Sequence, residues 1–94
     1  MSKFAAEGLS KAMAVELAQD GIRVNTVAPT FVLTPMTKPM FEDKEFHDFV
    51  MGMIPMKKLA SPEEVANACV FLLSDLSGST TGTSLRVDGG WTAE

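Results

Sequence analysis

The sequence is poor in residues and patterns that several classes of protein require. It has no tyrosine and one cysteine in 94 residues, and its 8 basic side chains against 12 acidic ones give a net charge of −4. No basic run or face stands out, so nucleic-acid binding is not expected. Cys69 has no cysteine partner and lies in an apolar run, which indicates a small buried hydrophobe in a reducing compartment.

Long apolar segments and targeting signals are lacking as well. The longest purely apolar run, residues 68–73, is far shorter than the roughly 20 residues of a membrane-spanning helix. The amino terminus has no basic segment followed by an apolar one, the pattern of a secretory signal. His47 is the only histidine and lies on a polar flank, so we interpret it as solvated, and no metal site is predicted. The sequence therefore predicts a cytoplasmic chain of at most one domain, with no membrane association.

Residues 22–34 contain the clearest strand pattern. Residues 22–28 include four β-branched side chains and are apolar on both faces; the four are Ile22, Val24, Thr26 and Val27. This pattern favours a central parallel strand that is covered on both sides. Pro29 is expected to end the strand, because proline has no N–H to give to the sheet. The following loop would lie at the carboxyl end of a parallel strand, where open α/β sheets bind their ligands.

A helix is predicted before this strand, over residues 2–19. One face repeats larger apolar side chains and the other carries mostly small ones; the faces are Leu9, Met13 and Leu17, and Ala5, Gly8, Ala12 and Val15. A helix with two apolar faces is expected to be buried twice, once against the sheet and once against another partner. Gly21 suits the left-handed position that ends such a helix.

The segment after the strand is rich in proline and methionine. Pro35 and Pro39 predict irregular structure over residues 34–40, and an amphipathic helix is predicted over residues 42–53. Five methionines lie in residues 34–57. Because methionine is flexible and fills irregular gaps, this segment is either a mobile lid over an apolar substrate region or a loosely packed corner.

The most specific local signal is the start of the next helix. Ser61 as the N-cap, Pro62 in the first turn and Glu64 three residues after the serine form a capping box, and the helix should continue to about residue 74. A second strand is predicted over residues 84–87. A crossover that contains two helices should be right-handed, so the two strands are expected to be parallel neighbours.

The residues Arg23-Val24-Asn25-Thr26-Val27-Ala28-Pro29, followed by Val32 and Thr34, resemble the sixth strand and following loop of the short-chain dehydrogenases/reductases. Lys3 with the helix behind it, and Val87-Asp88-Gly89-Gly90, resemble this family at the expected distances. The resemblance covers nearly all of the chain but only the last third or so of a family member. It implies an α/β fold in which residues 1–94 form the carboxyl-terminal part of one NAD(P)-binding domain. The implied element order is helix-strand-helix-helix-strand, the end of a doubly wound parallel (Rossmann-like) sheet.

The resemblance also implies roles for four residues. Lys3 matches the lysine of the catalytic Tyr-x-x-x-Lys pair, which binds the nicotinamide ribose and lowers the pKa of the tyrosine. Pro29 matches the proline packed beside the nicotinamide, and Val32 and Thr34 match the contacts to its carboxamide. The implied cofactor is NAD or NADP. The implied reaction is hydride transfer between this cofactor and the carbonyl or secondary alcohol of a sugar, polyol or oxoacyl substrate. Without the resemblance, Lys3 would be interpreted as a solvated surface charge.

The chain also departs from the family pattern. The family's tyrosine would fall four residues before Lys3, ahead of Met1, and the catalytic serine and glycine-rich dinucleotide loop have no counterpart here. Thr30 replaces the glycine that usually follows the proline. A start at an internal methionine of a longer gene is compatible with these departures. Because a partial site cannot run the reaction, we expect a carboxyl-terminal fragment of an oxidoreductase that is inactive alone.

Two interpretations from other classes stay open. In one, the chain is a non-catalytic assembly module that binds full-length subunits of the family or itself. The resemblance places the helix over residues 2–19 in a four-helix dimer interface, which would account for its small face; the alternative is a helix buried within its own monomer. In the other interpretation, the chain is a truncated reading frame without function.

Overall fold

The computed structural model describes residues 3–93. Its elements are α1 (Lys3–Leu17), β1 (Thr26–Pro29), α2 (Lys38–Phe41), α3 (Lys44–Met53), α4 (Pro62–Leu73) and β2 (Ser84–Val87), with short 3-10 helices η1 (Ala18–Asp20), η2 (Asp75–Ser77) and η3 (Trp91–Ala93). The predicted α/β class is confirmed, as are the predicted positions of the three long helices and of the second strand. Among residues 3–93, none of the helices combines the length and apolar character that a membrane span requires.

The two strands form a parallel sheet, in which Thr26 pairs with Ser84 and Pro29 with Val87. The expectation that they are parallel neighbours is therefore confirmed. Strand β1 begins later than residue 22, however, and it includes Pro29. Before Thr26 the two segments are joined by one side-chain and one backbone hydrogen bond: the Val24 N–H donates to Thr81 Oγ1 at 3.1 Å, and the Val24 carbonyl accepts from the Gly82 N–H at 2.8 Å. Pro29 is accommodated because it is the last residue of the strand, where a missing N–H costs little.

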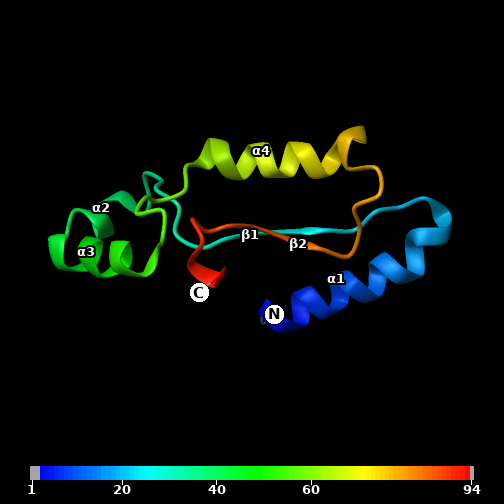
Figure 1. Ribbon diagram of the computed structural model, residues 1–94, viewed down its shortest axis with the longest axis horizontal. Coiled ribbons are helices and arrows are strands. Elements are labelled where there is room, and N and C mark those ends of the chain that lie inside the picture. Colours follow the sequence, from blue (N-terminus) through cyan, green and yellow to red (C-terminus); the bar gives the residue numbers. More distant parts are fainter. Residues whose placement is uncertain (1–2, 94) are drawn as a thin grey trace.

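Helices lie on both sides of the sheet and beyond one of its ends (Figure 1). Helix α4 runs along one side of the strands, and α1 lies on the opposite side. Both strands run in the same direction toward α2 and α3, which gather beyond their carboxyl ends. The loops that position a ligand in an open α/β sheet are therefore the ones that connect to α2 and α3 and to the carboxyl terminus.

The amino ends of the strands are joined by the side chains of Arg23 and Asn25. The Arg23 guanidinium donates to the Ser77 hydroxyl at 2.9 Å and to the Ser74 carbonyl at 3.2 Å, which connects β1 to the end of α4. The Asn25 amide donates to the Thr80 carbonyl at 3.0 Å, and its oxygen accepts from the Thr83 N–H at 3.1 Å. These contacts hold the turn before β2 beside the start of β1.

The capping box predicted at the start of α4 is confirmed. The Glu64 N–H donates to Ser61 Oγ at 3.1 Å, and the Ser61 N–H donates to Glu64 Oε1 at 2.9 Å. Lys58 Nζ lies 2.7 Å from Glu64 Oε2. This hydrogen bond from Lys58, followed by the backbone bond from Ser61, lowers the pKa of Glu64 below its ordinary value.

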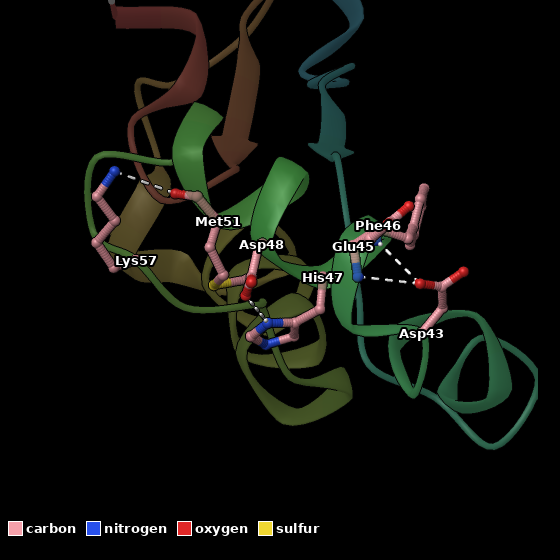
Figure 2. A network of polar contacts seen from close by, with 7 residues as sticks. All are labelled: Asp43, Glu45, Phe46, His47, Asp48, Met51 and Lys57. Carbon is pink, nitrogen blue, oxygen red and sulfur yellow. Dashed lines mark hydrogen bonds and ion pairs between the residues drawn. The ribbon is translucent and has the colours of Figure 1, made fainter.

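Helix α3 is held at both ends by side chains (Figure 2). The Asp43 carboxylate accepts hydrogen bonds from the Glu45 and Phe46 N–H groups at 3.0 and 3.4 Å. At the other end, Lys57 Nζ donates to the Met51 carbonyl at 3.1 Å, which suits a cation at the negative end of a helix. The predicted range of residues 42–53 is thus confirmed to within two residues.

The prediction of irregular structure over residues 34–40 is wrong for its last part. Residues Lys38–Phe41 form the short helix α2, with Pro39 in its first turn. Proline in the first turn has a suitable φ and lacks only an N–H that would have no partner in the helix. Pro39 therefore helps to start a helix, where the sequence analysis took it as a breaker.

The buried residues are few and scattered. The buried hydrophobic side chains in the described part are Ala14, Val50, Ile54 and Leu72, which belong to different helices and the loop after α3. The accessible surface is 6562 Å², whereas a compact monomer of 10.1 kDa exposes about 5,300 Å². The radius of gyration is 15.6 Å, compared with about 12 Å for a compact domain of this length. The chain is therefore more open than a self-contained domain.

The two apolar faces predicted for α1 are not covered by the described residues. Leu9, Met13 and Val15 are 52%, 39% and 80% exposed, and the side of α1 that is buried within the chain carries Ser10 and Ala14. The expected burial of the larger apolar face against the sheet is wrong for Leu9 and Met13, whereas burial of the small face against another partner stays a prediction. Cys69 is half-buried rather than fully buried, and it is a free thiol.

We expect Ser61→Ala to lower the free energy of unfolding by about 1 kcal/mol, because the first turn of α4 loses its N-cap oxygen and the Glu64 N–H its acceptor. Urea unfolding followed by far-ultraviolet circular dichroism measures the change. Glu63→Gln is the matched control, since Glu63 is exposed in the same turn and should shift stability by less than about 0.5 kcal/mol. Equal effects of the two substitutions would contradict a stabilising role for the capping box.

Candidate functional site

Three of the four residues implied by the resemblance lie together in the loop that follows β1. Pro29 ends the strand, and Val32 pairs with Ala60 in an isolated parallel bridge. The bridge consists of the Ala60 N–H donating to the Phe31 carbonyl at 3.1 Å and the Leu33 N–H donating to the Ala60 carbonyl at 3.0 Å. Because consecutive residues of an extended chain point their backbone groups in opposite directions, the N–H and C=O of Val32 face away from Ala60.

The loop is closed by two threonines. Thr37 Oγ1 donates to the Val32 carbonyl at 2.7 Å and accepts from the Thr34 N–H at 2.9 Å. The Thr37 N–H donates in turn to Thr34 Oγ1 at 3.2 Å. Thr37 is a site residue that the sequence analysis missed. The three-residue spacing of Thr34 and Thr37 could have indicated their contact, because threonine hydroxyls commonly bond to backbone groups three residues away.

The resulting loop offers a donor and an acceptor for a small polar group. The Val32 N–H makes no hydrogen bond to any residue in the range 3–93, while the Val32 carbonyl is occupied by Thr37. Thr34 Oγ1 accepts one hydrogen bond from the Thr37 N–H, and a hydroxyl oxygen has two lone pairs. A primary carboxamide carries both an acceptor oxygen and N–H donors, so the loop fits the carboxamide of a nicotinamide.

Lys3, the fourth implied residue, starts α1, but its side chain lies outside the described residues. Its predicted role is therefore untested by the structure. His47 lies on the surface of α3, where its ring nitrogen is 3.4 Å from the Asp48 carboxylate and its side chain is 44% exposed (Figure 2). Residues 3–93 include no cluster of histidine, cysteine, aspartate and glutamate that could hold a metal ion.

The segment after β2 forms the other side of this end of the sheet. The Asp88 carboxylate accepts from the Thr92 hydroxyl at 2.6 Å, from the Gly90 N–H at 3.0 Å and from the Thr92 N–H at 3.3 Å. The Thr92 hydroxyl is the main cause of a lowered pKa at Asp88; burial opposes the shift, and the backbone N–H groups and the Arg86 charge support it. From the sequence, residues 88–90 were expected to end a strand and to resemble a family motif, but the hydrogen bonds of Asp88 were not predicted.

An open hollow of about 270 Å³ lies beside this segment. Its lining includes Lys58 and Glu64 from one side and Arg86, Asp88 and the two following glycines from the other. Pro29, Val32 and Thr34 do not line it. Of these three residues Pro29 is exposed, whereas Val32 and Thr34 are half-buried.

Comparison with known proteins places the chain in a family. The family model described as "Enoyl-(Acyl carrier protein) reductase" matches residues 1–92. The chain is 47% identical to D-erythrulose reductase of Gallus gallus, over 96% of this chain and 37% of that protein. It is 46% identical to human L-xylulose reductase, over 98% of this chain and 38% of that protein.

The structural comparison agrees with the sequence comparison. A putative 2-deoxy-D-gluconate 3-dehydrogenase from Agrobacterium tumefaciens with bound NADP superposes with a TM-score of 0.88 at 36% identity, over 94% of this chain and 36% of that one. The chain therefore spans less than two fifths of the length of these relatives and of this solved structure.

We expect the segment that Asp88 holds to loosen in acid. A carboxyl group whose pKa is lowered in the folded state stabilises that state above its ordinary value of 3.8, and the contribution is lost as the pH falls through the lowered pKa. Acrylamide quenching of the single tryptophan, Trp91, should therefore be constant from pH 7 to about 4 and should rise below that range.

Asp88→Asn should abolish this acid step, because an amide does not titrate, whereas Asp75→Asn at an exposed position in η2 should leave it in place. A step that survives in Asp88→Asn would show that another group controls the segment.

Proposed function

Because this chain belongs to the short-chain dehydrogenase/reductase family, we propose that it is the carboxyl-terminal part of an NAD- or NADP-dependent oxidoreductase. The reaction proposed for the complete site is hydride transfer between the cofactor and the carbonyl or secondary alcohol of a sugar, polyol or oxoacyl substrate. The relatives' names support a small sugar carbonyl as the first candidate substrate. The observation that carries the proposal is the loop after β1, in which the Val32 N–H has no hydrogen-bond partner among the described residues and lies close in sequence to the Thr34 hydroxyl.

Each candidate residue has a proposed task. The Val32 N–H donates to the oxygen of the nicotinamide carboxamide, and Thr34 Oγ1 accepts from its amide nitrogen. Pro29 packs beside the ring at the end of the strand. Lys3 binds the ribose, and its positive charge lowers the pKa of a tyrosine that the complete site requires and this chain lacks. NAD or NADP would supply or accept the hydride, and the residues of this chain orient the ring toward the substrate.

The proposed roles can be tested by combining this chain with the missing part of a relative. The purified 94-residue chain should show no oxidation of NADH or NADPH with L-xylulose or D-erythrulose, because it has no tyrosine and no phosphate-binding loop. Mixed with the part of human L-xylulose reductase that precedes the matched region, it should restore turnover, measured as loss of absorbance at the wavelength of the reduced cofactor.

Thr34→Ala should reduce the restored kcat/KM by roughly tenfold or more, the effect of losing one hydrogen bond to a bound group. Glu63→Gln, which alters an exposed carboxylate on α4, should not. Turnover by the 94-residue chain alone, or equal activity of Thr34→Ala and the parent in the mixture, would contradict the proposal.

A second candidate function is assembly with other chains of the same fold. It is supported by the large exposed surface and by Leu9, Met13 and Val15 of α1, whose side chains are exposed. The free edge of β1 supports it too. Thr26 and Ala28 direct their backbone groups toward β2, so those of Val27 point to the open side of the sheet. Self-association, or binding to full-length subunits, would bury these groups.

We expect the 94-residue chain to sediment at micromolar concentration as a dimer or larger species. Val15→Lys should shift it toward the monomer, because it places a charge on the exposed apolar face of α1, where Val15 is 80% exposed. Glu16→Lys is the matched control: it adds a larger positive change in charge one residue away but removes no apolar surface. A single compact species of 10.1 kDa for the parent would contradict assembly.

A further inference from the structure

Trp91 joins the carboxyl-terminal segment to the loop that carries the candidate cofactor residues. Its ring is stacked on that of Phe31, with the ring centres 5.1 Å apart and the planes within 10° of parallel. Phe31 lies between Pro29 and Val32 in the loop after β1. The side chain that follows the end of β2 therefore contacts the loop that follows β1, although about sixty residues separate them in sequence.

Phe31 is also the centre of a larger group of rings. Phe41 of α2 and Phe46 of α3 meet it edge-on, with ring centres at 6.1 and 6.5 Å and interplanar angles of 88° and 84°. Phe41 and Phe46 contact each other at 5.3 Å. We call Phe31, Phe41, Phe46 and Trp91 the aromatic cluster. Edge-to-face and stacked pairs at these separations are favourable arrangements, so the cluster ties α2, α3 and the carboxyl-terminal segment to one loop residue.

The backbone before Trp91 is shaped to bring the indole to this place. Gly89 and Gly90 adopt left-handed φ values of 64° and 96°. A Cβ atom on Gly89 would lie 2.6 Å from Ile54 Cγ2, and one on Gly90 would lie 3.3 Å from the Pro55 ring. The Gly89 carbonyl accepts from the Met56 N–H at 3.0 Å. The segment can pass this close to the end of α3 only without side chains, and the Asp88 hydrogen bonds then fix the turn that starts at Trp91.

From this geometry we propose that Trp91 is a positioning residue. Through its stacking on Phe31 it holds residues 31–37, and with them the Val32 N–H and the Thr34 hydroxyl, in place at the carboxyl end of β1. Its importance for hydride transfer rests on the proposed function, whereas its effect on the loop is a property of this chain alone. Trp91 itself touches neither of the candidate carboxamide contacts in this proposal; it acts through Phe31.

Hydrogen exchange of the 94-residue chain, followed by mass spectrometry, tests the effect on the loop. The reporters are the N–H groups of Leu33, Thr37 and Lys38, which donate to Ala60 and Thr34 carbonyls within the loop region. The internal reference is the amino end of the sheet, where the Thr26 N–H donates to Thr83 and the Gly82 N–H donates to Val24.

Trp91→Ala should speed exchange of the loop reporters by about tenfold or more and leave the reference peptides within about twofold. Trp91→Phe, which keeps an aromatic ring, should recover most of the protection. Phe49→Ala is the matched control, because Phe49 is a 65% exposed ring on α3 outside the aromatic cluster. A purely structural role would raise exchange in the loop and the reference together, and that result would overturn the proposal. So would unchanged loop exchange in Trp91→Ala, or a parent loop as unprotected as a free peptide.

A substitution of Phe31 tests the same stacking contact between Trp91 and Phe31. Trp91 is the single tryptophan and the chain has no tyrosine, so its fluorescence reports on one place. Phe31→Leu should shift its emission to longer wavelength and speed loop exchange as Trp91→Ala does, while Phe49→Leu should do neither. An unshifted emission in Phe31→Leu would overturn the proposal.

The complementation mixture separates this proposal from the proposed function. If exchange responds as expected but the mixture shows no turnover, the positioning role stands and the proposed function fails. If turnover is restored and loop exchange does not respond to Trp91→Ala, the proposed function stands and the positioning role fails. When both hold, Trp91→Ala should raise the KM for the nicotinamide cofactor several-fold more than it lowers kcat, because the residue acts on the place where the carboxamide binds.

Discussion

The parallel pairing of β1 with β2 is the contact on which the rest of the molecule depends. The paired residues Thr26 and Ser84 are 58 positions apart, so closing the sheet orders all the helices of the crossover at once. The pairing is supported at its amino end by Arg23 and Asn25, whose side chains bind the turn between α4 and β2. Without them the two strands would have only four paired residues each to hold them together.

The same pairing places the candidate cofactor loop and the carboxyl-terminal segment next to each other. Parallel strands end at the same edge of a sheet, so the loop with Val32 and the tail with Trp91 emerge side by side beyond the strands (Figure 1). The loop is shaped by hydrogen bonds from Ala60 and Thr37, and the tail by the Asp88 carboxylate. The aromatic cluster then joins both to α2 and α3. The methionine-rich segment therefore has a defined anchor in Phe41 and Phe46, although Met36, Met40 and Met56 remain exposed on its surface.

The described residues leave exposed several surfaces that a doubly wound fold normally covers. In a doubly wound sheet each interior strand has a neighbour on both edges, and helices cover both faces. Here β1 has one neighbour, and the outer sides of α1 and α4 carry Leu9, Val15, Val70 and Leu73 in contact with solvent. A helix that is apolar around most of its circumference is normally buried. The strand pattern of residues 22–28 likewise favours a strand that is covered on both sides.

Local signals in the sequence determined the elements whose causes are local. The capping box of Ser61 and Glu64, the left-handed Gly21 and the strand of residues 84–87 were all predictable, because each depends on a few adjacent side chains. The family motif located Pro29, Val32 and Thr34. Tertiary structure decided what depends on distant partners. Examples are the start of β1 at Thr26, where contacts of Val24 and Asn25 with Thr81 and Thr83 precede the strand, and the covered side of α1, which carries Ser10 and Ala14. It also decided the stacking of Trp91 on Phe31. The pairing of β1 with β2 brings the two rings together, and the spacing of residues along the sequence does not show which rings will meet.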